Sequence, residues 1–347
     1  MGSRRALTVL VTVVAAVVAA APAAAAARHH PHAPVVTELA TFAAPTCPDG
    51  SGCGSGSTVG PDGALYVTDG PGGRVVRVDP ATGALSTFAS GLPPAIPEVG
   101  IGGAMDVAFL GHTAYVLVTV VGPALGQPDV VNGIYRVHRD GSVEPVADIG
   151  TWSVEHPPAT DFFVPSGVQY SMETYHGGFL VADGHHNRVL QVSRHGDIRE
   201  LIAFGNIVPT GLEVLGPHIL LGQAGPIPHT PETGKVVQFT PWSEATDVAS
   251  GAPLIVDVEL GPHWRLYALS QGIWDLAPIP GNEGKPASAN TGRLLRVDHH
   301  GGFRTVVGGL DRPTSVDFIG DSAFVVTLTG KVLRVDDLGR RHRGGRH

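Results

Sequence analysis

Residues 61–92 read PDGALYVTDGPGGRVVRVDPATGALSTFASGL, in which three short apolar runs are separated by Gly, Pro and Asp. Runs of this length, bounded by turn residues, are typical of β-strands. The Asp62-Gly63 turn precedes the first run, and a glycine-rich break and Asp79 bound the second. A unit of this size has too few apolar side chains to bury its faces alone. We therefore expect several copies of it to stack against one another.

The middle run of this unit recurs along the whole chain. Each copy opens with Gly or Asn, commonly followed by a basic residue, and continues with apolar residues that one polar position interrupts. The six copies lie 38 to 59 residues apart and begin at Gly73, Asn132, Asn187, Gly234, Gly292 and Gly330. Two further strands precede each copy and an outer strand follows most of them. Four strands per repeat at this spacing predict the blades of a β-propeller.

The two ends of the repeat array complement each other. After the sixth copy the chain passes directly into a basic tail and supplies no outer strand, whereas residues 35–43 form an orphan run with the character of one. Pairing of this run with the last repeat would close the ring and remove its exposed sheet edges. We predict an all-β fold, a six-bladed β-propeller closed by an N-terminal outer strand that completes the last blade. The domain is expected to span residues 28–339.

Both termini carry segments that we place outside this domain. Residues 1–27 contain Arg4 and Arg5, an apolar stretch and an Ala-rich end, which predict a signal peptide cleaved near Ala27 and a secreted, extracellular protein. The sequence does not distinguish general export from twin-arginine export. The apolar run is short and Ala-rich, so we expect no stable membrane anchor. Residues 340–347 form a basic tail that we expect to be disordered.

The net charge and the two cysteines restrict the classes of partner that this protein is expected to bind. Removal of the signal leaves 21 basic and 31 acidic side chains, a net charge of −10. This charge opposes the binding of nucleic acid or an anionic membrane as the main task. The two cysteines, Cys47 and Cys53, favour a disulfide that closes a small Gly-rich loop; half of a metal site is the alternative. We expect a monomer that binds a small molecule, an extracellular protein or a cell-wall component.

Three stretches carry a resemblance to a known family. They are GPDGALYVTDG at 60–70, GGAMDVAFLG at 102–111 and VPSGVQYSMETYHGGFLVADGHHNRVLQVSRHGDI at 164–198. They resemble the ScyD/ScyE family of NHL-like six-bladed propellers, and the resemblance covers nearly the whole mature chain. It implies a propeller and secretion, and it implies no defined reaction. The residues at 184–187 and at 152–161 depart from the family pattern, so the chain resembles a divergent member.

The long insertions of this chain fall on one face of the predicted propeller. Inner strands begin on the face where second strands end, and the connections at 120–131, 150–164, 224–233 and 272–291 lie there. Insertions gathered on one face usually mark the functional face. The candidate binding residues on this face are Trp152, Glu155, His156, Asp183, His185, His186, Gln223, Gln271 and Trp274.

The densest polar run is Asp183-Gly184-His185-His186-Asn187. Its residues are consecutive and do not converge from several loops, so we favour a loop in which Asp183 and Asn187 bond backbone groups over a metal site. Asp69 occupies the equivalent turn of the first repeat, which also favours a structural role. Trp152 and Trp274 fit equally well a platform for a flat ligand and the packing of long loops.

A catalytic metal centre is not expected. Six-bladed lactonases of the gluconolactonase type hold Ca²⁺ at the axis with Glu, Asn and Asp side chains, and hard cations need several such oxygen ligands. The inner-strand starts of this chain supply two carboxylates, Asp106 and Asp257, and no Asn. We expect no cofactor, with Asp106 and Asp257 as ligands if Ca²⁺ is present. The chain also has no nucleophile elbow, phosphate loop or H-E-x-x-H motif.

We therefore predict a non-catalytic binding or accessory module. The alternative is a lactonase- or lyase-like enzyme whose site lies on the same face of the propeller.

Overall fold

The computed structural model describes residues 33–42, 55–227, 229, 233–277, 282 and 285–338. The predicted signal peptide, the Cys47–Cys53 disulfide and the basic tail lie outside these residues. No helix in the described part of the chain is long and apolar enough to cross a membrane.

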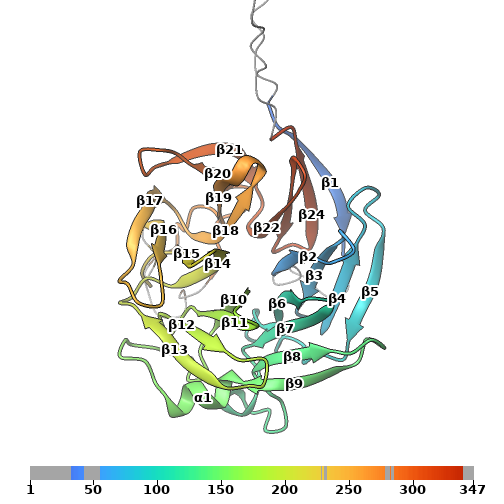
Figure 1. Ribbon diagram of the computed structural model, residues 1–347, viewed down its shortest axis with the longest axis vertical. Coiled ribbons are helices and arrows are strands. Elements are labelled where there is room, and N and C mark those ends of the chain that lie inside the picture. Colours follow the sequence, from blue (N-terminus) through green and yellow to red (C-terminus); the bar gives the residue numbers. More distant parts are fainter. Residues whose placement is uncertain are drawn as a thin grey trace, which may run out of the picture. The chain divides into compact units, whose positions relative to one another are not determined.

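Six four-stranded antiparallel sheets surround a common axis, which confirms the predicted propeller (Figure 1). The strands of blades 1 to 6 are, in order, β2 (Ser57–Val59), β3 (Leu65–Asp69), β4 (Arg74–Val78) and β5 (Leu85–Ser90); β6 (Gly103–Leu110), β7 (Thr113–Thr119), β8 (Gly133–Val137) and β9 (Val143–Asp148); β10 (Gln169–Tyr175), β11 (Gly178–Asp183), β12 (Arg188–Val192) and β13 (Ile198–Ala203); β14 (Pro209–Leu215), β15 (His218–Gln223), β16 (Gly234–Phe239) and β17 (Thr246–Ala252); β18 (Ile255–Gly261), β19 (Arg265–Ser270), β20 (Gly292–Val297) and β21 (Phe303–Leu310); and β22 (Pro313–Ile319), β23 (Ser322–Thr327), β24 (Lys331–Asp336) and β1 (Val35–Thr41).

The core lies between the blades. Each pair of successive blades shares an apolar cluster, as where Val67 and Val76 of blade 1 meet Phe324 and Val332 of blade 6. The apolar runs of the second and third strands supply most of these side chains, whereas the outer strands are largely exposed. A blade on its own would expose both apolar faces of its sheet to water, so each blade depends on its neighbours for burial.

Three local features add to the predicted repeat pattern. The inner strand of blade 3 begins at Gln169. Blade 4 has an outer strand, β17, whose polar and glycine-containing sequence carries little hydrophobic signal. The connection after blade 2 forms a helix, α1 (Ile149–Glu155), because the Asp148 side chain caps it by accepting a hydrogen bond from the Thr151 N–H. Two short 3₁₀ turns, η2 (Pro123–Leu125) and η3 (Pro262–Trp264), complete the described elements.

The ring closes as predicted. β1 pairs antiparallel with β24, with Val36 opposite Val335 and Thr41 opposite Lys331. β1 also contacts the next blade as the other outer strands do. Gly83, in the turn between β4 and β5, has a positive φ and lies against the carbonyl oxygen of Leu39, just as Gly196 of blade 3 lies against Val146 of β9. The N-terminal strand is therefore equivalent to the outer strands that the other blades contain in sequence.

We expect the substitution Gly83→Ala to weaken this closure. A Cβ at residue 83 would clash with the Leu39 carbonyl oxygen of β1. Gly63→Ala is the matched control, because Gly63 has a similar positive φ and open space where a Cβ would lie. The control should cost about 1 kcal/mol of unfolding free energy from backbone strain alone, and Gly83→Ala about 1–3 kcal/mol more from overpacking. Denaturant unfolding measures both, and equal losses would contradict a tight contact at the closure.

Candidate functional site

The connections between second and third strands and those between blades share one face of the propeller, here called the loop face. It is the face at which β3, β7, β11, β15, β19 and β23 end. Every candidate binding residue named above lies on it. Two open surface hollows lie on the opposite face, lined by turns such as residues 136–142 and 191–199, and contain none of these candidates.

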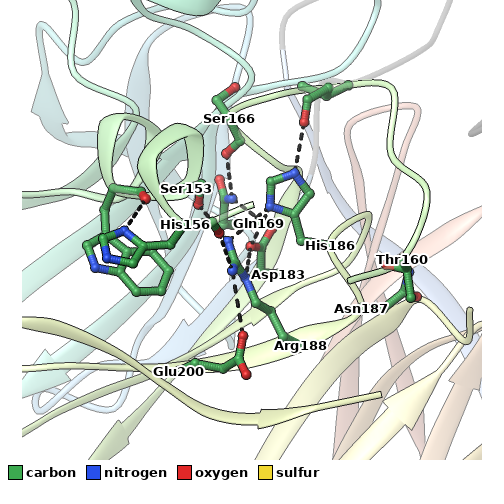
Figure 2. A network of polar contacts seen from close by, with 12 residues as sticks. Ser153, His156, Thr160, Ser166, Gln169, Asp183, His186, Asn187, Arg188 and Glu200 are labelled. Carbon is green, nitrogen blue, oxygen red and sulfur yellow. Dashed lines mark hydrogen bonds and ion pairs between the residues drawn. The ribbon is translucent and has the colours of Figure 1, made fainter. Parts of the chain in front are cut away.

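Asp183 is the centre of a buried polar network (Figure 2). Its Oδ2 accepts a hydrogen bond from Arg188 Nε at 2.9 Å and lies 3.2 Å from His186 Nδ1. Its Oδ1 accepts from Gln169 Nε2 at 2.9 Å. The side chains of Asp183 and Arg188 are 0% and 1% exposed. Because both carboxylate oxygens have partners and the opposite charge lies beside them, this burial needs no ligand to offset it.

Arg188 connects this network to α1. Its Nη1 donates to the carbonyl oxygen of His156 at 2.7 Å and its Nη2 to Ser153 Oγ at 3.1 Å. Its guanidinium lies 4.9 Å from the centre of the Trp152 ring, which in turn stacks on His156. Trp152 and His156 therefore help to pack α1 against blade 3. Glu155 is exposed at the end of the same helix.

The same acid–base pair occurs in blade 1. Asp69 Oδ2 accepts from Arg74 Nε at 2.7 Å, and the Asp69 side chain is fully buried. The spacing of five residues between acid and arginine is the same as in Asp183 and Arg188, so this pattern is the sequence signal that would have identified Arg188. Asn187 bonds backbone as expected, since its Oδ1 accepts from the N–H groups of Ile207 and Val208. The same expectation for Asp183 was wrong, because its carboxylate bonds the side chains of Gln169 and Arg188.

We expect Arg188→Met to destabilise the protein strongly. The substitution leaves the Asp183 charge buried without its counter-charge, a loss of about 3–5 kcal/mol in comparable cases. Arg74→Met is the matched variant, and it should cost less because the Arg74 side chain is 31% exposed and bonds Asp69 within its own blade. Thermal and denaturant unfolding of the two variants provide the comparison. Similar losses of unfolding free energy in the two variants would show that the contacts between Arg188 and α1 add nothing to stability.

A second group of side chains on the loop face lacks such partners. Each of six buried polar atoms accepts or donates no hydrogen bond within the described part of the chain, and all six lie on this face: Asn132 Oδ1, Ser166 Oγ, His185 Nδ1, Gln223 Oε1, His229 Nδ1 and Trp274 Nε1. Ser166, His185, Gln223 and Trp274 are between 1% and 7% exposed. Each such atom costs about 1–3 kcal/mol unless a partner satisfies it.

Several of these residues form one cluster that spans blades 3 to 5. His185 Nε2 lies 3.0 Å from the Tyr170 hydroxyl, and the rings of His229 and Trp274 are 5.7 Å apart. Tyr170 and Trp274 pack on the same apolar group, which contains Val208, Ala224, Leu254 and Ala287. We call Tyr170, His185, His229 and Trp274 the histidine–tryptophan cluster. Gln223 is joined to it through the neighbouring Ala224.

The cluster is uncharged at neutral pH. Burial lowers the pKa of His185 to about 4 and the pKa of His229 to about 4. Burial also raises the pKa of the Tyr170 phenol well above its usual value. Asp183, which acts electrostatically on His185, is ion-paired with Arg188.

Gln271 and Trp274 belong to the long connection of blade 5. Gln271 Oε1 accepts from the Ala287 N–H at 2.9 Å, so Gln271 braces this loop. Trp274 is packed into the loop as one of the two sequence interpretations proposed, and its indole nitrogen has no hydrogen-bond partner among the described residues. Sequence reasoning did not single out Tyr170 or Asn132. The place of these two residues among the buried polar groups of the loop face depends on which blades are neighbours, and no local motif indicates it.

The inner strands carry more carboxylates than the sequence interpretation recognised. Besides Asp106 and Asp257, four acids occupy one register, each opposite the third residue of its second strand: Glu173, Glu213, Glu259 and Asp317. The expectation of two carboxylates was wrong because it considered only the first positions of each strand. Side chains two residues further on point to the same face and therefore also line the axis.

These axial carboxylates titrate at unusually high pH. Burial raises the pKa of Glu173 to about 7, of Asp257 to about 8 and of Asp317 to about 6, and the neighbouring carboxylates add to each shift. Burial also places the pKa values of Asp106 and Glu259 well above the ordinary range. Charging this group of side chains is unfavourable because no counter-charge offsets its burial.

The described residues do not fit a Ca²⁺ centre of the lactonase type. Asp106 Oδ2 accepts from the Met172 N–H and Asp257 Oδ2 from the Val316 N–H, each at 2.7 Å, so both side chains join one blade to the next. Within the described ranges no three His, Cys, Asp or Glu side chains are placed to hold one metal ion. Ca²⁺ requires six or more oxygen ligands, by contrast.

We expect the unfolding free energy to fall as the pH rises from about 4, the ordinary carboxyl pKa of the unfolded chain, to about 8, the highest of these folded pKa values. A carboxylate whose pKa is raised on folding stabilises the fold while protonated, and this contribution is lost as the pH passes its folded pKa. The melting temperature should fall by about 5 °C or more. Glu173→Gln should reduce this fall because it removes one titrating group, whereas Glu155→Gln, at an exposed site, should not. An unchanged profile in Glu173→Gln would exclude Glu173 from the effect.

Comparisons with known proteins place the chain in a structural class. No protein-family model and no curated protein matches its sequence. Virginiamycin B lyase from Staphylococcus aureus is similar in structure, with 13% identity, 88% of this chain and 99% of that chain covered, and a TM-score of 0.53. For a gluconolactonase from Xanthomonas campestris these values are 10%, 87%, 89% and 0.57. For the PQQ-bound aldose sugar dehydrogenase of Streptomyces coelicolor they are 14%, 88%, 99% and 0.55.

These likenesses and the strand order define the fold class, a six-bladed β-propeller. At such low identity they carry no function over to this chain.

Proposed function

We propose that the protein is an exported propeller of the ScyD/ScyE type that acts as a non-catalytic binding or accessory module. Its ligand is a small molecule or part of an extracellular partner, and it binds on the loop face at the histidine–tryptophan cluster. The observation that carries this proposal is the gathering of unpartnered buried polar atoms on that one face.

Two sites on the loop face differ in whether the protein satisfies their buried polar groups. Around Asp183 the chain supplies a partner for each carboxylate oxygen, so the fold is able to satisfy buried polar groups here. Around Trp274 and Gln223 the described residues leave such groups without partners, at a cost in stability. A ligand that offers hydrogen bonds to these atoms would offset that cost. Binding sites commonly combine an apolar lining with a few polar groups of this kind.

The contrast predicts opposite effects of two equivalent substitutions. Gln223→Met removes an unpartnered acceptor and should raise the unfolding free energy of the free protein by about 1 kcal/mol. Gln169→Met removes a side chain bonded to Thr119, Asn132 and Asp183, and should cost about 3 kcal/mol or more. Denaturant unfolding tests both. A loss of stability in Gln223→Met comparable to that in Gln169→Met would overturn the inference that Gln223 serves a ligand.

A second candidate function is enzymatic. Glu173, with a pKa of about 7, is partly accessible from the axis and has a proton affinity suited to general acid–base chemistry near neutral pH. Structures similar to this chain include a lyase and a gluconolactonase. Hydrolysis of glucono-δ-lactone by the purified protein, lost in Glu173→Gln with an unchanged melting temperature, would favour a lactonase-like enzyme over the binding module.

A further inference from the structure

The polar atoms of the loop-face site restrict the chemistry of its ligand. Trp274 Nε1 is a hydrogen-bond donor and Gln223 Oε1 is an acceptor. Ser166 Oγ can act as either, and so can His185 Nδ1, according to the tautomer that the Tyr170 hydroxyl selects at Nε2. A ligand that satisfies this set must offer both donors and acceptors. Hydroxyl groups offer both from a single atom.

The charge of the site restricts the ligand further. His185, His229 and Tyr170 are neutral at pH 7. Asp183, the charged group that acts on His185, is bonded to Arg188, and both are bonded to neighbouring groups. An ionised ligand would lose its hydration here without meeting an opposite charge, which is costly in a buried environment. The site is therefore built for an uncharged molecule.

The rim of the site is apolar. Phe163 is 54% exposed and lies 4.7 Å from the His185 ring, and Ile273, beside Trp274, is 41% exposed. Val208, Ala224 and Leu254 form the apolar group beneath. Exposed apolar side chains of this size next to unsatisfied polar atoms suit a ligand with one C–H face and several hydroxyl groups.

We propose that the histidine–tryptophan cluster, with Ser166 and Gln223, binds an uncharged polyhydroxylated ring, the chemistry of a neutral saccharide. The hydroxyl groups bond the unpartnered atoms of Gln223 and Trp274, and the C–H face of the ring covers Phe163. This inference rests on the proposed binding function and specifies its ligand class.

The test uses the mature full-length protein and calorimetric titration with a panel of neutral disaccharides and methyl hexosides. Each neutral probe is paired with an acidic analogue that carries a uronic acid and a basic analogue that carries an amino sugar. At least one neutral probe should bind, and its charged analogues should bind at least about tenfold more weakly, a difference of about 1.4 kcal/mol.

Three variants locate the binding. Gln223→Met and Trp274→Phe should each weaken binding of the neutral probe by about tenfold, while unfolding measurements show that both variants are folded. Trp242→Phe is the matched control, because Trp242 is 85% exposed in a turn on the opposite face. The affinity of this variant for the neutral probe should equal that of the wild type.

The outcomes separate the ligand class from the proposed function. Equal binding of neutral and charged probes, or binding of a charged probe alone that still depends on Gln223 and Trp274, overturns the saccharide chemistry and leaves the binding site in place. Failure of the whole neutral panel to bind also overturns the saccharide inference. If a probe binds and none of the cluster variants alters its affinity, the proposal of a loop-face site is itself overturned.

Discussion

The antiparallel pairing of β1 with β24 is the interaction on which the rest of the structure depends. Each blade buries its apolar faces only against the neighbouring blades, so an open ring would expose the cluster that Val67 and Phe324 share between blades 1 and 6. Closure also fixes the inner strands around one axis. The loop face inherits its geometry from this arrangement, because the cluster spanning blades 3 to 5 exists only while those blades keep their relative positions (Figure 1).

The loop face contains two kinds of buried polar group, and their difference is informative. The Asp183–Arg188 pair is satisfied on every side and ties α1 to blade 3, so it supplies rigidity. Gln223 Oε1 and Trp274 Nε1 are also buried, but in the described part of the chain they have no hydrogen-bond partner. This arrangement is expected where a ligand supplies the missing hydrogen bonds. The bonded pair holds the site rigid, and the unbonded polar atoms are already removed from water when the protein folds, so binding does not have to desolvate them.

The sequence places the candidate residues on one face but does not indicate their partners. The positions of the long insertions follow from strand order, so the sequence alone assigns Trp152, Asp183, His185, Gln223 and Trp274 to the loop face. Which of them are satisfied by the protein depends on distances between segments far apart in the chain. The axial acids Glu173, Glu213 and Glu259 were missed for a related reason: their convergence requires the register of each inner strand as well as its existence.

The sequence by itself determined the architecture, because apolar runs, turn residues and a repeat near one blade in length leave few ways to bury the core. The orphan strand at residues 35–43 was enough to predict closure of the ring. The last blade lacks an outer strand, and pairing this orphan strand with it completes the blade. Only the tertiary structure decided the chemistry of the site. Whether Arg188 neutralises Asp183, and whether Trp274 Nε1 finds an acceptor, depends on packing between blades, which no local pattern in the chain encodes.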